Sequence, residues 1–199
     1  REDGWSDVEA QIRNWNYFTW LSGDHIVEQH VHNIDIMNWA LGAHPVSCFA
    51  LGGRQQRTGS EFGHIYDHFA VEFEYPGGVR VQSLCRQSED VFERVGEHLV
   101  GTKGTSNPGK DIAGKELYRF KGQDADPYVK EHADLIAGIR DGKPLNEARN
   151  VAESTMAAIM GRMSAYTGQE IAWDQALNSK VSLIPEKLEF GPLPVAPVA

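Results

Sequence analysis

The clearest pattern of apolar and polar positions in the first half of the chain predicts a helix over residues 25–41. Asp24 precedes this helix as an N-cap, and Gly42 follows it as a C-terminal stop. Residues 1–21 are dense in aromatic side chains but show no clean period. In that stretch we expect only a short helix over residues 8–14, followed by a packed loop.

The middle of the chain changes to the period of two that is typical of strands. Apolar side chains alternate with polar or small ones over residues 69–75, and Val79 resumes the alternation after a turn at residues 76–78, so the sequence predicts a hairpin. Further strands are expected over residues 46–51, 92–101 and 116–120, with a turn-rich segment at 104–109. These elements predict an antiparallel sheet with one face free for helices and the other for a partner.

Helical spacing returns in the second half, over residues 128–140 and 148–166, with a break at 142–144. We expect both helices to cover the sheet. Residues 190–199 are rich in proline and predict an extended tail. The predicted fold class is therefore α+β, an open-faced and predominantly antiparallel sheet with helices packed on one face. Residues 1–189 would form one domain, and residues 190–199 the tail.

The composition restricts the kind of partner more than the kind of fold. Of the 199 residues, 41% are hydrophobic and 24% are charged, which is typical of a globular protein. The net charge of -9 argues against a nucleic-acid partner, and no apolar run approaches the roughly 20 residues that cross a bilayer. We expect a soluble protein, cytoplasmic or periplasmic, with no membrane role. Because the chain begins with Arg1 rather than Met, we also expect that it was cut from something longer.

The predicted helix over residues 25–41 concentrates chemical groups on one face. At about 100° per residue, an arc narrower than a quarter turn holds His25, Glu28, His32, Asp35 and Trp39. A polar face made of histidines and carboxylates is unusual for a helix that is merely solvated. The opposite arc is apolar and includes His30, so we expect His30 to be a core histidine with a hydrogen-bond partner rather than a ligand.

Glu28 and His32 are the leading catalytic candidates. They are four residues apart and hence neighbours on the surface of a helix. A carboxylate beside an imidazole can orient it as a general acid/base that takes the proton of a hydroxyl as the hydroxyl becomes a carbonyl. Two alternatives stay open. The pair could be structural, or His25, Glu28 and His32 could bind a divalent metal such as zinc or manganese.

Further candidates lie outside this helix. His64, Asp67 and His68 form a second polar cluster before the hairpin, which fits either a loop-borne contribution to a site or ordinary strand-entry residues. Arg86 could hold a hydroxyl or carboxylate of a substrate, or could pair with a nearby acid such as Glu89. The run at 101–105 lacks the spacing of a phosphate loop and predicts a turn between strands.

Residues 22–35 and 39–42 resemble the C-terminal domain of the glucose-fructose oxidoreductase/inositol dehydrogenase (Gfo/Idh/MocA) family. The resemblance continues through the hairpin at 69–79, the turn at 101–104 and the segment 171–174. It covers essentially the whole chain, and the motif on the helix is fairly specific.

The resemblance implies a role for several named residues. In that family an acid and a histidine four residues apart on this helix, with a lysine from the other domain, form the catalytic set beside the nicotinamide ring. The matching positions here are Glu28, where the family commonly has Asp, and His32. His25, Tyr17 and Trp20 lie where the resemblance places a substrate pocket.

The resemblance also implies that a part is missing. The Rossmann domain of the family, with its Gly-rich fingerprint and the catalytic lysine, has no counterpart in these 199 residues. We therefore expect no cofactor-binding residue in this chain and NAD(P) only in the full-length protein, so that the chain alone would not transfer a hydride. The exposed side of the sheet is expected to pair with another subunit in a homo-oligomer.

Three hypotheses for function follow. The leading one is the substrate-binding and catalytic half of an NAD(P)-dependent oxidoreductase acting on a sugar, polyol or glycoside. Besides His32 and Glu28, its candidate substrate contacts are His25, Tyr17, Trp20, His64 and Arg86. The alternatives are a metal-assisted carbohydrate lyase or hydrolase, and a non-catalytic module for sugar binding or assembly.

Overall fold

The computed structural model of the chain describes residues 1–123 and 125–195. The chain forms two compact units, one from Arg1–Glu93 together with the segment from Glu153 onward, and one from Arg94–Ala152. Each unit contains an open four-stranded antiparallel sheet, so the predicted α+β class is confirmed, although the strands form two sheets rather than one. Residues 196–199 of the predicted tail lie outside the described residues.

The sheet of the first unit has the strand order β3-β2-β1-β8. Its strands are β1 (Ser47–Gly53), β2 (His68–Tyr75), β3 (Val79–Arg86) and β8 (Ile171–Ala172). The predicted hairpin is confirmed, since β2 and β3 pair along their whole length. They are joined by the 3-10 turn η3 (Pro76–Gly78), in which Gly77 and Gly78 adopt φ values of 80° and 76° that favour glycine.

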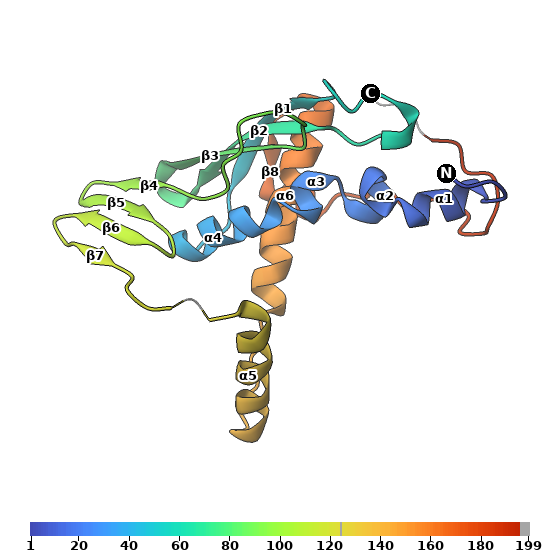
Figure 1. Cartoon of the computed structure of the whole chain (residues 1–199). Helices are drawn as coiled ribbons and strands as arrows, with labels where there is room; N and C mark the ends of the chain where they lie inside the picture. Colours follow the sequence, from blue (N-terminus) through green and yellow to red (C-terminus); the bar gives the residue numbers. More distant parts are fainter. Residues whose placement is uncertain (124, 196–199) are drawn as a thin grey trace. The chain divides into compact units, whose positions relative to one another are not determined.

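One face of this sheet is buried. Alternate β2 residues, from Phe69 to Tyr75, share a core cluster with Ile26, Ile34 and Met160 from the covering helices. The longest of these helices is α6 (Ala148–Thr167), which packs on the sheet (Figure 1). A Cβ added to Gly161 would lie 3.0 Å from the Ile26 side chain, so the absence of a side chain there lets α6 approach closely.

The helical elements before β1 differ from the predicted pattern. They are α1 (Asp7–Arg13), η1 (Trp15–Tyr17), α2 (Thr19–Ser22), α3 (His25–Glu28) and α4 (Val31–Leu41). Of these, α3 and α4 contribute residues to the core cluster together with α6. The prediction of one helix over residues 25–41 is wrong, because the chain breaks at Gln29 and His30. There the His25 carbonyl accepts from the backbone N–H groups of both residues, which interrupts the regular ladder. The ends are as predicted: Asp24 caps α3, and Gly42 ends α4 in a left-handed conformation.

The second unit consists of a small sheet and one helix. Its elements are β4 (Leu99–Gly101), β5 (Gly104–Asn107), β6 (Asp111–Gly114), β7 (Tyr118–Arg119) and α5 (Pro127–Arg140). The turn after Gly101 is confirmed, but the predicted strand from residue 92 begins only at Leu99, and the segment predicted as turn-rich contains β5. Helix α5 buries none of its 14 residues, so the prediction that it covers a sheet stays a prediction.

Two short elements complete the fold, η2 (Ser60–Phe62) in the loop before β2 and α7 (Trp173–Leu177) after β8. The chain end returns to the start of the first unit, since the Leu193 N–H donates to Asp7 and the Gln11 amide donates to the Leu193 carbonyl. Within the described residues, no helix has the length and apolar character that crossing a membrane requires.

Candidate functional site

Glu28 and His32 lie on either side of the break between α3 and α4. Glu28 is the last residue of α3 and is half-buried, whereas His32 is the second residue of α4 and is exposed. No hydrogen bond joins the two side chains in the described structure. They therefore do not form the regular pair on one continuous helix that the spacing predicts, but both can be reached from solvent.

His25 and His30 lie on the inner side of the same break. His25 is only 3% exposed, with Nδ1 3.2 Å from the Tyr66 carbonyl oxygen, so it does not share a surface with His32. His30 Nε2 hydrogen-bonds with the Ser83 hydroxyl at 2.7 Å, which confirms the prediction of a core histidine with a partner. Burial, reinforced by the nearby His25, lowers the pKa of His30 to about 4.

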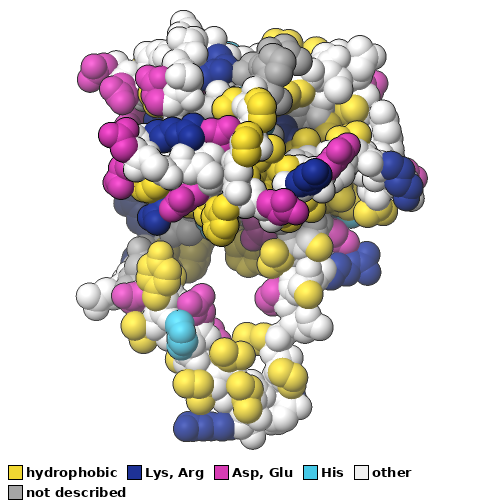
Figure 2. All heavy atoms as spheres, turned by 90° about the vertical axis from the view of Figure 1, so that its right-hand side faces the viewer, with side chains coloured by type: hydrophobic (Ala, Val, Ile, Leu, Met, Phe, Trp, Pro, Cys, Tyr) yellow, Lys and Arg dark blue, Asp and Glu magenta, His cyan; other side chains and the backbone are white. Residues whose placement is uncertain are grey.

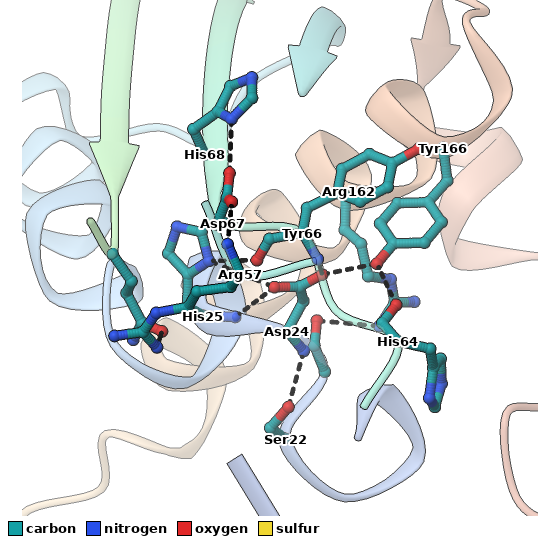
Figure 3. Close-up of polar contacts among 12 residues, drawn as sticks. Ser22, Asp24, His25, Arg57, His64, Tyr66, Asp67, His68, Arg162 and Tyr166 are labelled. Atoms are coloured by element: carbon teal, nitrogen blue, oxygen red, sulfur yellow. Dashed lines mark hydrogen bonds and ion pairs between the residues drawn. The ribbon is translucent and has the colours of Figure 1, made fainter. Parts of the chain in front are cut away.

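Asp24 lies at the centre of a buried polar network (Figure 3). Its side chain is 0% exposed and accepts from the His25 N–H at 2.7 Å, the Tyr66 N–H at 3.0 Å and the Tyr166 hydroxyl at 2.7 Å. The sequence indicated only the capping bond, because Tyr66 and Tyr166 are 42 and 142 positions away. His25 Nε2 is buried and has no hydrogen-bond partner among the described residues.

The second predicted cluster, His64, Asp67 and His68, is divided by the structure. Asp67 is fully buried and accepts from the backbone N–H groups of residues 55–57 and from His68 Nδ1 at 2.7 Å. Burial alone would raise the pKa of Asp67, but these hydrogen bonds hold it down to about 2. His64 faces Thr19 instead, with Nε2 2.7 Å from the hydroxyl, and burial lowers its pKa.

The remaining candidates lie in three places. Tyr17 is next to His64, since the backbone N–H of His64 donates to the Tyr17 carbonyl, and both side chains are half-buried. Trp20 points its indole N–H at the Gln11 amide oxygen, at 2.8 Å. Arg86 is opposite His68 in the β2–β3 register, so both side chains lie on the face of the sheet that the helices leave open. There the Arg86 guanidinium donates to the Phe92 carbonyl, and Arg86 does not join His32.

The predicted metal set is not brought together. His25 is buried with Nδ1 turned to a carbonyl, whereas His32 is exposed. Among the residues that the structure describes, no group of three or more His, Cys, Asp and Glu side chains could hold a metal ion. The geometry therefore gives no support to the metal-assisted alternative.

The described residues do not fit a nicotinamide dinucleotide. Every pair of strands in the two described sheets is antiparallel, whereas a dinucleotide-binding Rossmann unit needs parallel strands with a helical crossover and a Gly-rich turn. On the face shown in Figure 2, Lys and Arg side chains are scattered among Asp and Glu side chains. That pattern and the net charge of -9 do not suggest a nucleic-acid partner.

Comparison with known proteins shows the family of this chain. The family model described as the GFO/IDH/MocA C-terminal domain matches residues 3–107, just over half of the 199-residue chain. The chain belongs to this family. The match includes α3 and α4, and so covers the Glu28 and His32 positions of this Gfo/Idh/MocA domain.

A curated protein matches part of the chain. The 2,7-anhydro-N-acetylneuraminate hydratase of Escherichia coli is 27% identical over 78 residues, which is 39% of this chain and 20% of that protein.

Solved structures match a larger part of the Gfo/Idh/MocA domain. An oxidoreductase from Thermotoga maritima has a TM-score of 0.65 and 17% identity, covering 88% of this chain and 51% of its own. A scyllo-inositol dehydrogenase from Lactobacillus casei, solved with NAD(H) and scyllo-inositol, has a TM-score of 0.61 and 13% identity, covering 83% and 52%. At these identities the likeness shows the fold alone, and the chain spans about half the length of either structure.

Proposed function

We propose that this chain is the substrate-side domain of an NAD(P)-dependent oxidoreductase that acts on a sugar, polyol or glycoside. The observation that carries the proposal is that the family match includes Glu28 and His32, and that both side chains are accessible to solvent at the break between α3 and α4. The solved relative with NAD(H) and scyllo-inositol supports this class of substrate and cofactor. A separate Rossmann domain would hold the cofactor, because the described residues do not fit it.

His32 is proposed as the general acid/base. Its imidazole would take the proton from a substrate hydroxyl as that carbon becomes a carbonyl, and would return it in the reverse direction. Glu28, across the break, would orient the imidazole and offset the positive charge that the imidazole gains. Glu28 has one methylene more than the Asp common in the family, so its carboxylate can extend further from the backbone toward the imidazole.

Tyr17, Trp20 and His64 are proposed as substrate contacts, because all three are partly accessible. Aromatic rings bind the apolar faces of sugars, while the phenol hydroxyl and the imidazole can bond to sugar hydroxyls. His25 and Arg86 fit this role less well. The side chain of His25 is 3% exposed, and Arg86 lies on the opposite face of the sheet.

We further propose that the open sheet face pairs two copies of this chain. Leu51, Ala70 and Leu84 form one row across strands β1, β2 and β3, and Phe49 lies beside it. Phe49, Leu51 and Leu84 are 48%, 63% and 71% exposed. A contiguous apolar surface of this kind is typical of an interaction site.

The decisive experiment uses the full-length protein that contains this domain. Purified enzyme is assayed for NAD⁺ or NADP⁺ reduction against a panel that includes scyllo-inositol, myo-inositol and common aldoses. His32→Ala is expected to lower kcat/KM by about 10²–10⁴-fold, and Glu28→Gln by less. His132→Ala, at an exposed position in α5, is the matched control and should leave activity unchanged.

Three outcomes would overturn the proposal. Full activity of His32→Ala would remove the assigned acid/base. Sugar binding by calorimetry without any turnover of the panel would favour the non-catalytic binding module instead. A hydrated product formed without net reduction of the nucleotide would point to the reaction class of the Escherichia coli relative, which is named a hydratase.

A further inference from the structure

The backbone of Asp24 is in a conformation that its side chain must hold. Asp24 has φ 78° and ψ 160°, and Asp24 and Asp90 are the two non-glycine residues with positive φ in the described chain. Such a conformation is costly for a residue with a Cβ and persists where surrounding contacts enforce it. Asp90 is exposed, whereas Asp24 is 0% exposed. The contacts of a buried side chain are therefore available to hold Asp24 in place.

The carboxylate of Asp24 joins three separate segments. One oxygen accepts from the His25 N–H at the start of α3, and the other accepts from Tyr66 in the loop before β2 and from Tyr166 on α6. Arg162, one helical turn before Tyr166, donates to the Gly23 carbonyl at 3.2 Å and places a guanidinium near this carboxylate. Helix α6 thus holds the N-terminal end of α3 through two side chains (Figure 3).

The same helix also holds α4. The Ser154 hydroxyl of α6 donates to Asp35 at 2.6 Å and accepts from the Asn38 amide at 3.1 Å. The Asn38 oxygen in turn accepts from the Tyr75 hydroxyl at 2.7 Å. The two ends of the segment that carries Glu28 and His32 are therefore attached to one helix, with the break between them.

From this arrangement we infer that Asp24 is a positioning residue, whose buried carboxylate sets the placement of α3 and hence of Glu28 relative to His32. This inference deepens the proposed function and rests on it only for its catalytic consequence. The structural part of the inference can be tested separately. Loss of the carboxylate must release α3 and the loop at Tyr66 while leaving the pairing of β1, β2 and β3 intact.

Amide hydrogen exchange of the chain, followed by NMR, tests the structural part without any activity. Asp24→Asn keeps one accepting oxygen but loses the second, so we expect exchange at His25 and Tyr66 to accelerate by about tenfold or more, with the strands unchanged. Asp90→Asn is the matched control, because it makes the same substitution at the other positive-φ position. It should leave amide exchange at His25 and at Tyr66 unchanged.

Tyr166→Phe serves as a second variant in case Asp24→Asn fails to fold. It removes only one donor to the carboxylate, and faster exchange confined to α3 and Tyr66 would support the inference. Unchanged exchange in α3 in the folded variants, or equal acceleration throughout the sheet, would overturn it. If neither variant folds, the network is a general core element, and the inference is likewise overturned.

The catalytic consequence is measured in the full-length enzyme. Asp24→Asn should lower kcat by about 10–100-fold with a much smaller change in KM, because a displaced catalytic group costs rate more than binding. Faster exchange without any loss of kcat would leave the structural role intact and count against His32 and Glu28 as the catalytic pair. A loss of kcat without faster exchange would overturn the positioning role.

Discussion

His30 Nε2 and the Ser83 hydroxyl oxygen lie 2.7 Å apart, although the two residues are 53 positions apart in sequence. This bond attaches the break between α3 and α4 to strand β3. Because burial lowers the pKa of His30 to about 4, the imidazole is neutral near pH 7 and the bond is a neutral one. The segment between Glu28 and His32 is thus fixed from the core side, which keeps the break in a defined place.

Ser83→Ala removes the hydroxyl that bonds to His30 Nε2 and leaves this nitrogen of the half-buried ring without that partner. We expect the free energy of unfolding to fall by about 1–3 kcal/mol in urea denaturation at neutral pH. Ser60→Ala, at an exposed position, is the control and should change that free energy by less than about 0.5 kcal/mol. Equal small effects of the two variants would show that the bond adds nothing to stability.

The lowered pKa of His30 makes stability depend on pH. The folded pKa of about 4 lies below the ordinary 6.5, so between these pH values the unfolded chain binds more protons. The contribution of neutral His30 to the free energy of unfolding is therefore complete above pH 6.5. It is lost as the pH falls toward 4, which lowers that free energy by about 2–3 kcal/mol.

Unfolding free energies measured across this pH window for wild type and His30→Asn check that expectation. The variant should lose clearly less stability on acidification than the wild type. An equal loss would assign the effect to other groups, among them His64, whose pKa is also lowered by burial.

Asp67→Asn tests the loop that leads into β2. The substitution removes one charged oxygen from a carboxylate that accepts from three backbone N–H groups and from His68. We expect the free energy of unfolding to fall by about 2–4 kcal/mol at neutral pH, compared with little change for the exposed Asp3→Asn.

The pH dependence of this effect has a defined sign. The pKa of Asp67 is lowered from 3.8 to about 2, so its contribution is complete above pH 3.8 and disappears as the pH falls through 2. The difference in unfolding free energy between wild type and Asp67→Asn should shrink in that range. A difference that stays constant down to pH 2 would contradict the assignment.

Leu84→Lys tests the open sheet face. Leu84 is 71% exposed on strand β3, at one end of the apolar row of the proposed contact, so a charge there should shift the chain from dimer to monomer in light scattering at micromolar concentration. Val95→Lys replaces another apolar side chain, which is 87% exposed and belongs to the second unit, and should leave the mass unchanged. A monomeric wild-type chain, or a Leu84→Lys variant that stays dimeric, would count against this interface.

Local patterns in the sequence predicted what local physics controls. The β2–β3 hairpin follows from alternation over residues 69–75 and a turn that needs two glycines at positive φ. The cap at Asp24 and the stop at Gly42 follow from the groups that helix ends leave unpaired. The position of Glu28 four residues before His32 is likewise readable from sequence alone.

Tertiary contacts decided the rest. The spacing predicted an unbroken helix over residues 25–41. The break at His30 is bonded to Ser83 on a strand 53 positions away, and helical periodicity contains no information about that contact. The three segments that meet at Asp24 are also invisible to spacing, because Tyr66 and Tyr166 approach it only after the sheet and α6 have packed. Periodicity reports which face of an element is apolar, whereas a buried polar group is satisfied by whatever donor the fold brings to it. For this reason the sequence could indicate His32 and Glu28, and only the folded chain could show what holds them in place.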